Sequence, residues 1–354
     1  MTEEKVKLLF NNSTQPQQRG VALMLVLWVM AILSIIVAEF AFSMRTELKI
    51  AGNYKEEAEN YYRAQAAIQQ ALTEILHPDV AYHYVDGGKL IFGKKEQTLE
   101  GEAPAQKAET ENTVPQRGKL PLNNGFFSYK IEDEEGKIYL NRFAIDNEPN
   151  RQILSRLLEM GGNVTDEAER ETIIDSIMDW LDKDDLHKIN GAEDDYYKGL
   201  DPPYECKDGP FDTVEELLLV KGMTPQILFG TTDEQGTTSG GIAKYLTVWG
   251  TNRFNPYTAD ETTRVIMFGE EQAAAMELYD ENGKPKNRVF STRFSIIGRG
   301  YPQTGAGQRM VKAVVVLNRK NGVPSARIMH WNDNLIGYPW DDNQKQNQPD
   351  RAEN

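Results

Sequence analysis

An uninterrupted apolar run at residues 21–38, VALMLVLWVMAILSIIVA, is the feature that most constrains this chain, and Ser34 is its only polar residue. As a helix that rises about 1.5 Å per residue, the run spans about 27 Å, enough to cross the hydrocarbon core of a bilayer. A secretory signal peptide has a shorter apolar region followed by small residues, whereas Glu39 follows here. Arg19 at the N-terminal border predicts a cytoplasmic N-terminus, with the rest of the chain beyond the membrane. On this segment alone, a plain signal anchor remains an alternative.

The helix is expected to continue well past the apolar run. Neither a proline nor a pair of glycines occurs between Glu39 and Pro78. Residues such as Tyr61, Ile68, Leu72 and Ile75 recur at helical spacing. The sequence therefore predicts one helix over residues 21–76, with its first half in the membrane and its amphipathic second half packed on a globular head.

Composition narrows the classes of function. The 354 residues suggest about two globular units, and a single cysteine, Cys206, excludes an internal disulfide. We interpret Cys206 as an inert loop thiol. The net charge of −15 disfavours nucleic acid as a partner and favours divalent cations. No His-x-x-x-His pair, Gly-x-Ser-x-Gly elbow or glycine-rich phosphate loop is present, so the sequence predicts no enzyme, with a membrane-anchored metal-dependent enzyme as a minor alternative.

The N-terminal architecture resembles type IV pilins and type II secretion pseudopilins. In those families a prepilin peptidase cuts after the glycine that ends a short polar leader, and the new N-terminus is methylated. The resemblance places the cut between Gly20 and Val21. The fifth mature residue of the family is usually Glu, a costly carboxylate in hydrocarbon unless it pairs with the N-terminal amine of another subunit. Leu25 stands there in this sequence, which within the pseudopilins marks the K-type minor component.

Landmarks further along also resemble the K type. Residues 126–143 alternate around Glu135-Gly136 and predict a β-hairpin, and residues 252–259 resemble an Asn-x-Asn-Thr-Ala box that precedes a helix over 260–278. Three strands are expected at 289–297, 310–317 and 326–331. The resulting fold class is α+β: a pilin-like long N-terminal helix packed on an antiparallel sheet, with a large all-helical domain inserted between strands. The expected organisation is a leader at 1–20, the helix at 21–76, a first segment of the pilin-like head at 77–145 with a flexible linker at 94–123, the inserted acidic domain at 146–248, a second segment of the head at 249–337, and a disordered tail at 338–354.

The inserted domain carries the candidate metal site. Residues 146–244 contain 23 acidic and 9 basic residues, a net charge of −14, and seven carboxylates lie within 179–195. So dense a set of carboxylates repels itself unless it is solvated or bridged by cations, and its oxygens suit Ca²⁺. An EF-hand is excluded because His187 occupies the position of its glycine. The similar segment of K-type proteins binds calcium, and this resemblance implies a structural Ca²⁺ site with candidate ligands Asp182, Asp184, Asp185, Glu193, Asp194 and Asp195. The alternative is a solvated acidic loop, and Trp180, Tyr196 and Tyr197 are expected to serve packing.

A second segment of the insertion, residues 214–228, looks like a helix-hairpin-helix. Only Gly222 of its usual two glycines is present, and Thr224-Pro225 is better suited to begin the next helix. Because the surroundings are acidic and would repel phosphate, we interpret the segment as a protein–protein module.

The resemblance implies a minor pseudopilin that caps the tip of the type II secretion pseudopilus and initiates its assembly. The alternative is a tip minor pilin of a related adhesion or DNA-uptake machine. The implied location is the bacterial inner membrane, crossed once, with a cytoplasmic N-terminus and a periplasmic head. The implied partners are the I- and J-type minor pseudopilins, the major pseudopilin, the prepilin peptidase and the inner-membrane secretion platform, with no nucleic acid.

Overall fold

The computed structural model describes residues 19–77, 80–86, 89–94, 116–232, 238–281, 286, 291–303, 307–320 and 323–335. The chain divides into two units, residues 1–58 and residues 59–354. The expected leader up to residue 18 and the expected tail at 338–354 lie outside the described residues, as does most of the expected linker.

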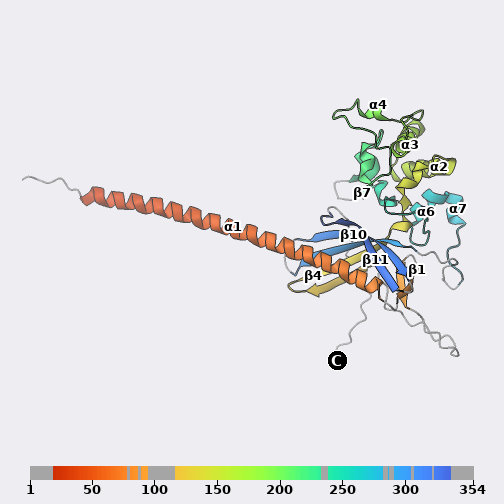
Figure 1. The fold of residues 1–354 in the computed structure, drawn as a ribbon. Helices are drawn as coiled ribbons and strands as arrows, with labels where there is room; N and C mark the ends of the chain where they lie inside the picture. The colour runs from red at the N-terminus through yellow and green to blue at the C-terminus, as the bar shows by residue number, and fades with distance from the viewer. Residues whose placement is uncertain are drawn as a thin grey trace, which may run out of the picture. The chain divides into compact units, whose positions relative to one another are not determined.

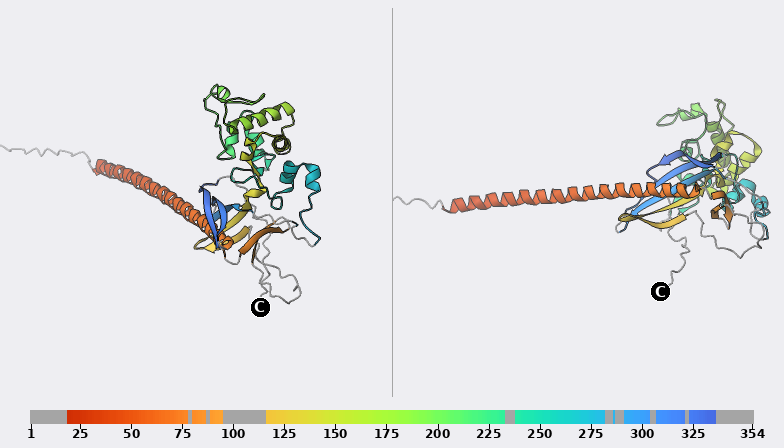
Figure 2. Two further views of the ribbon diagram at one scale, coloured as in Figure 1. Left: turned by 45° about the vertical axis from the view of Figure 1, so that its right-hand side comes forward. Right: turned by 60° about the horizontal axis from the view of Figure 1, so that its bottom comes forward.

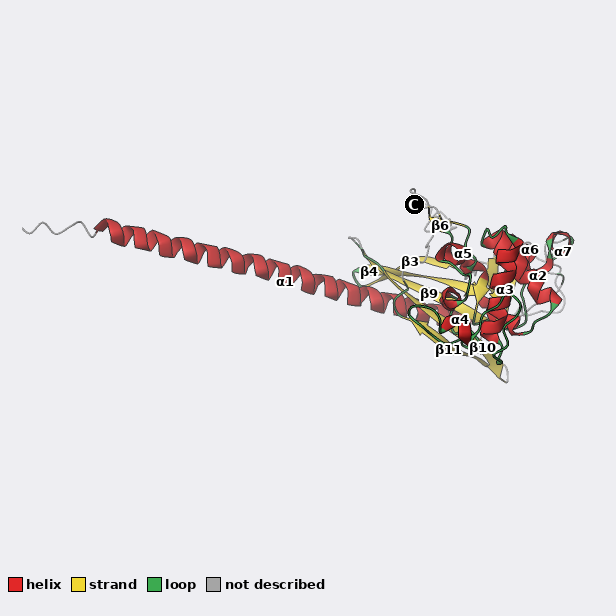
Figure 3. Ribbon diagram, turned by 90° about the horizontal axis from the view of Figure 1, so that it is seen from above, coloured by secondary structure: helices red, strands yellow, loops and turns green. Residues whose placement is uncertain are grey.

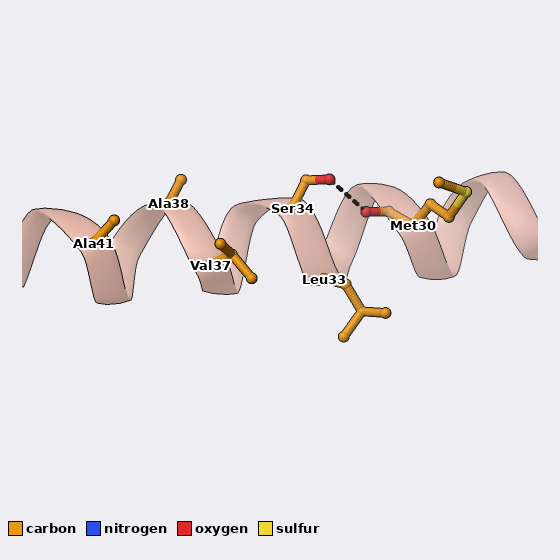
Figure 4. Close-up of a pocket in the computed structure, with 6 residues that line it drawn as sticks. All are labelled: Met30, Leu33, Ser34, Val37, Ala38 and Ala41. Atoms are coloured by element: carbon orange, nitrogen blue, oxygen red, sulfur yellow. Dashed lines mark hydrogen bonds between the residues drawn. The ribbon is translucent and has the colours of Figure 1, made fainter.

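The first unit is the N-terminal part of helix α1 (Arg19–Ile75). Side chains from Val21 to Ile50 are exposed, and an 18-residue window reaches a mean hydropathy of 2.9, so α1 is long and apolar enough to cross a membrane. Ser34 donates to the carbonyl oxygen of Met30 (2.8 Å), which satisfies its hydroxyl within the helix. Figure 4 shows Ser34, Ala38 and Ala41 on one side of α1 and Leu33 on the other.

The second unit is built on an antiparallel sheet, coloured yellow in Figure 3. Its strand order is β11-β10-β9-β4-β3, with β3 (Gln116–Leu122), β4 (Gly125–Asp133), β9 (Arg293–Pro302), β10 (Arg309–Lys320) and β11 (Val323–Asn332). A separate hairpin joins β1 (Val80–Asp86) to β2 (Lys89–Lys94). The strand β3 lies within the segment expected to be a flexible linker, so that expectation was wrong for residues 116–122.

The C-terminal turns of α1 pack on this sheet (Figure 2). Ala64, Ala67, Ile68 and Ala71 are fully buried against strand residues such as Tyr129 and Phe294. Two glycines of β9 allow the close approach: a Cβ at Gly298 would lie 2.2 Å from the carbonyl oxygen of Ala64, and one at Gly300 2.0 Å from that of Asn60. The helix backbone therefore rests directly on the strand, and the predicted packing of a long helix on an antiparallel sheet is confirmed.

The insertion interrupts the sheet at a single point. Strands β4 and β9 are antiparallel neighbours, and Asp133 at the end of β4 is the Cα partner of Phe294 at the start of β9. Because the chain leaves and returns at the same edge of the sheet, a large segment fits there without disturbing the strand order. The helices of this segment form a group of their own within the second unit (Figure 1 and Figure 2).

The elements between β4 and β9 are mostly short. The helices are α2 (Glu148–Arg156, continued as a π-turn over Leu157–Gly161), α3 (Glu167–Leu181), α4 (Asp194–Tyr197), α5 (Pro225–Phe229), α6 (Glu261–Phe268) and α7 (Glu270–Ala274). The 3₁₀ turns are Glu134–Gly136, Leu140–Ala144, Glu215–Leu219 and Ala243–Tyr245. Three short strands, β6 (Thr231–Thr232), β7 (Thr238–Ser239) and β8 (Leu246–Thr247), lie within residues 146–248, so this segment is mainly but not wholly helical.

Two sequence predictions for local structure were wrong. The expected hairpin at 126–143 does not form: β5 (Ile138–Tyr139) pairs in parallel with β8, not with β4. The cause is the 3₁₀ turn at Glu134–Gly136, whose acidic side chains are buried and bonded to residues far along the chain. The expected helix at 260–278 breaks at Gly269, which adopts a left-handed φ of 83° and ends α6.

A network of buried polar groups joins the sheet to the insertion. Asp133 Oδ2 accepts hydrogen bonds from Asn255 Nδ2 (3.0 Å), Thr258 Oγ1 (2.8 Å) and the Ser291 hydroxyl. The adjacent Glu134 accepts from the hydroxyls of Thr247 and Ser295. The acidic turn and the 252–259 box, two landmarks far apart in sequence, thus form one joint.

Candidate metal centre

Helix α3 positions the first carboxylates of the candidate site. Asp166 caps its N-terminus by accepting from Glu169 N (2.8 Å). Its core-facing side includes Ile173, Ile177 and Trp180, which fix the helix in the core of the insertion. Asp179 lies in its last turn and Asp182 is its C-cap, so the two lie three residues apart on the same face.

Asp179 organises the loop after α3 and leaves no oxygen over for a metal. Its fully buried carboxylate accepts from Lys188 N (3.1 Å), Lys188 Nζ (3.1 Å) and Ala192 N (2.9 Å). Lys188 Nζ also pairs with Asp182 Oδ2 at 2.8 Å. A Cβ at Gly191 would lie 1.8 Å from Asp179 Oδ2. Only glycine, which has no Cβ, therefore fits where the backbone passes this carboxylate.

Four buried carboxylate oxygens, at the end of α3 and in the loops that follow it, have no hydrogen-bond partner of normal geometry. They are Asp182 Oδ1, Glu193 Oε1, Glu193 Oε2 and Asp208 Oδ1. Glu193 is only 2% exposed and immediately precedes α4. The loop that carries Asp208 is held in place because Asp194 Oδ1 accepts from Cys206 N (2.8 Å) and Gly209 N donates to the Trp180 carbonyl (3.2 Å).

Three ligand atoms converge here: a carboxylate oxygen of Glu193, the Cys206 sulfur and a carboxylate oxygen of Asp208 lie within 4.8 Å of one another. The pKa of Glu193 is raised to about 7, chiefly by burial, and the like charges of Asp179, Asp182 and Asp208 add to this rise while the Cys206 thiol opposes it. Buried, unpaired and mutually repelling carboxylates are costly for the fold unless a cation joins them.

These residues fit a hard divalent cation. Ca²⁺ takes six to eight oxygen ligands at about 2.3–2.6 Å, from carboxylates, carbonyls and water. The unpaired oxygens of Asp182, Glu193 and Asp208 are ligands of this kind, and those of Glu193 and Asp208 lie within 4.8 Å of each other. The thiol of Cys206 is not a donor that Ca²⁺ prefers.

The structure distributes the predicted ligands unevenly. Asp182 and Glu193 belong to the group with unpaired oxygens, whereas Asp184, Asp185 and Asp195 are exposed. Asp194 is already engaged, since its Oδ2 pairs with Lys198 Nζ at 2.6 Å and its Oδ1 holds Cys206 N. The metal-ligand assignment of these six residues therefore stays a prediction.

Sequence reasoning missed Asp208 and Cys206. Both follow the acidic run by more than ten residues and carry no spacing that marks a ligand. The available signal was the Asp208-Gly209 pair, a turn that brings a carboxylate back toward α3.

The aromatic residues next to the candidate ligands in sequence differ in burial. Trp180 and Tyr197 are buried with ring centroids 5.2 Å apart, and Trp180 stacks on Phe211 at 6.4 Å. Tyr196 is 38% exposed and lies under Lys221 Nζ, 5.1 Å from its ring centroid. The expected packing roles agree with the positions of Trp180 and Tyr197, whereas Tyr196 is exposed.

The fold defines a class: a pilin-like helix and antiparallel sheet interrupted by an acidic, mainly helical insertion. Residues 136–229 match the family described as Type II secretion system (T2SS), protein K. Among relatives, the chain is 26% identical over 218 residues to a putative type II secretion system protein K of Escherichia coli and 27% identical over 216 residues to protein K of Pectobacterium carotovorum. The first alignment covers 60% of each chain, and the second 58% of this chain and 59% of the relative. The chain thus matches about 60% of the length of these relatives.

A solved structure supports the fold. The crystal structure of the GspK–GspI–GspJ complex from the type 2 secretion system of enterotoxigenic Escherichia coli matches with a TM-score of 0.50 and 16% identity, covering 83% of this chain and 99% of that one. Together these findings confirm the resemblance to the protein K family of type II secretion systems.

Proposed function

We propose that this chain is a minor pseudopilin that caps the tip of a type II secretion pseudopilus and initiates its assembly. The observation that carries the proposal is the insertion at the junction of β4 and β9 in a pilin-like helix and sheet. It adds more than a hundred residues to the head, a bulk that disfavours regular stacking of subunits and is tolerated at an end.

Leu25 supports the same position. Its side chain is exposed on α1 (62%) and apolar, so it cannot pair with the amine of a subunit above. The chain can still offer its own amine to the subunit below. A subunit with only the second capacity belongs at the end of a filament.

Membrane insertion and processing follow from the same proposal. The apolar part of α1 crosses the inner membrane with Arg19 on the cytoplasmic side and the head in the periplasm. Prepilin peptidase removes residues 1–20 and leaves a methylated Val21. Ser34, Ala38 and Ala41 give α1 a side of small residues, which suits close packing against the helices of other subunits (Figure 4).

The proposed partners are the I- and J-type minor pseudopilins, whose counterparts accompany GspK in the matching complex, the major pseudopilin, the peptidase and the inner-membrane platform. Gold labelling of overproduced pseudopili tests the tip position. Label at one end supports the proposal, and label along the shaft overturns it. Intact-mass analysis tests processing: a chain that still begins at Met1 in peptidase-positive cells contradicts the cleavage at Gly20.

The proposed metal is Ca²⁺, bound by Asp182, Glu193 and Asp208 in a structural role. A cation bound only to the folded state adds RT ln(1 + [L]/Kd) to the free energy of unfolding and so raises the melting temperature. The full chain in detergent should melt higher in calcium than in EDTA. Asp182→Asn with Glu193→Gln should abolish this difference, and the control Glu159→Gln, at an exposed residue outside the acidic run, should keep it. Equal melting of the wild type in calcium and EDTA contradicts the site.

A further inference from the structure

The single cysteine of the chain, Cys206, lies in the cluster of possible metal ligands together with Glu193 and Asp208. Cys206 is 7% exposed, and its sulfur is within 4.8 Å of a carboxylate oxygen of Glu193 and one of Asp208. Its backbone amide is fixed by Asp194 Oδ1 (2.8 Å), so the main chain at this residue is held in place. A buried thiol between two carboxylates is an unusual neighbour for a purely oxygen-based site.

The companions of Cys206 independently point to a ligand. Glu193 is 2% exposed and neither of its oxygens has a hydrogen-bond partner of normal geometry, and Asp208 Oδ1 is also buried and unpaired. A cation that binds sulfur takes the thiolate form of Cys206, because metal coordination stabilises the thiolate.

The donor set matches a borderline-soft metal. Zn²⁺ takes thiolate sulfur at about 2.3 Å and carboxylate oxygen at about 2.0–2.2 Å, usually with four ligands. Ca²⁺ has little affinity for sulfur. One thiolate with two carboxylates, and water as the fourth ligand, satisfies Zn²⁺ without any further side chain.

We propose that Cys206, Glu193 and Asp208 form a Zn²⁺ site that competes with Ca²⁺ for the same carboxylates. The thiol proton passes to solvent as the metal binds, and the sulfur forms a bond to zinc. This inference shares Glu193 and Asp208 with the calcium site proposed above, but it depends on the sulfur, which the calcium site does not use. The cation held at the end of α3 would then depend on which metal is available.

Cobalt serves as the probe, because a thiolate-to-Co²⁺ charge-transfer absorption reports a metal–sulfur bond. The full chain in detergent, titrated with Co²⁺, should show this band in the near ultraviolet, and equimolar Zn²⁺ should remove it. Since the chain has one cysteine, any such band comes from Cys206, even if no variant of this residue folds. Glu193→Gln and Asp208→Asn should weaken the band, and the exposed control Glu159→Gln should leave it unchanged.

Cys206→Ser separates the two metals. The loss of an outer-sphere partner already weakens metal binding about 10- to 100-fold, so loss of the sulfur should weaken Zn²⁺ binding at least about tenfold. The rise of melting temperature in Ca²⁺ should persist in this variant. Absence of the cobalt band in the wild type, or equal Zn²⁺ affinity of wild type and Cys206→Ser, overturns the zinc site. If the zinc site is overturned while calcium still stabilises the wild type, the calcium proposal stands. If the cobalt band appears but calcium does not stabilise the wild type, the zinc site stands and the calcium proposal fails.

Discussion

The carboxyl of Asp133 offers a quantitative test of the joint between sheet and insertion. It is 8% exposed, and its two oxygens accept from Glu135 N, Asn255 Nδ2 and the hydroxyls of Thr258 and Ser291. Burial raises its pKa from 3.8 to about 6, although the hydrogen bonds oppose the shift. Desolvation therefore outweighs the favourable bonds to the charged form.

The sign of the pH effect follows from this balance. The folded state binds the proton of Asp133 more tightly than the unfolded state, so this group contributes stability as the pH falls through about 6 toward about 4. A shift of about two pKa units corresponds to about 3 kcal/mol, and about 2 kcal/mol of this should develop between about pH 7.5 and about pH 4.5.

Glu134 affects the free energy of unfolding in the opposite direction, at lower pH. Burial opposes its ionisation, but Lys137 and Lys312 lower its pKa to about 2, so its contribution is lost below about 4.5.

The assay is urea unfolding of the full chain in detergent, followed by tryptophan fluorescence, for wild type and Asp133→Asn. The difference between the two curves cancels most other titrating groups. Wild type should gain about 2 kcal/mol relative to the variant on going from about pH 7.5 to about pH 4.5. The control Gly52→Ala, which removes no titrating group and whose Cβ meets no atom within 4 Å, should show a flat difference. A flat difference for Asp133→Asn, or one in which wild type loses stability toward low pH, would refute the argument that desolvation dominates.

Three further predictions concern packing and the joint. Gly298→Val should separate α1 from β9 and destabilise the second unit by about 1–3 kcal/mol in urea unfolding, whereas Gly52→Ala, whose Cβ meets no atom within 4 Å, should be neutral or slightly stabilising; similar values for both would contradict the close contact. Asn255→Ala removes bonds to Asp133 and Ser291 and should cost about 1–3 kcal/mol, a loss that unchanged thermal melting would rule out. Lys312→Met removes one of two cations near Glu134 (3.6 Å) and should destabilise by less than the about 3–5 kcal/mol of a fully unpaired buried charge; since the pKa of Glu134 then rises, acid unfolding should begin at a higher pH.

The sequence by itself determined the elements whose signals are local. The apolar run at 21–38 and the periodic residues up to Ile75 predicted a helix that the structure has at Arg19–Ile75, because helical periodicity lies within a few residues. Thr224-Pro225 likewise predicted the start of α5, where Thr224 caps the helix. The excess of carboxylates at 179–195 pointed to the region of the candidate site, since charge density can be read without a fold.

Only the tertiary structure decided which residues distant in sequence contact one another. The pair of β4 and β9 joins residues more than 150 positions apart, where the sequence favoured a local hairpin. Burial of Asp133 and Glu134 in bonds to Asn255, Thr247 and Ser295 outweighed the alternating pattern of residues 126–143. In the same way, Asp208 and Cys206 join Glu193 because the loop after α4 folds back on α3. Contacts of this kind join segments that are far apart in the chain, so no short stretch of sequence contains both partners.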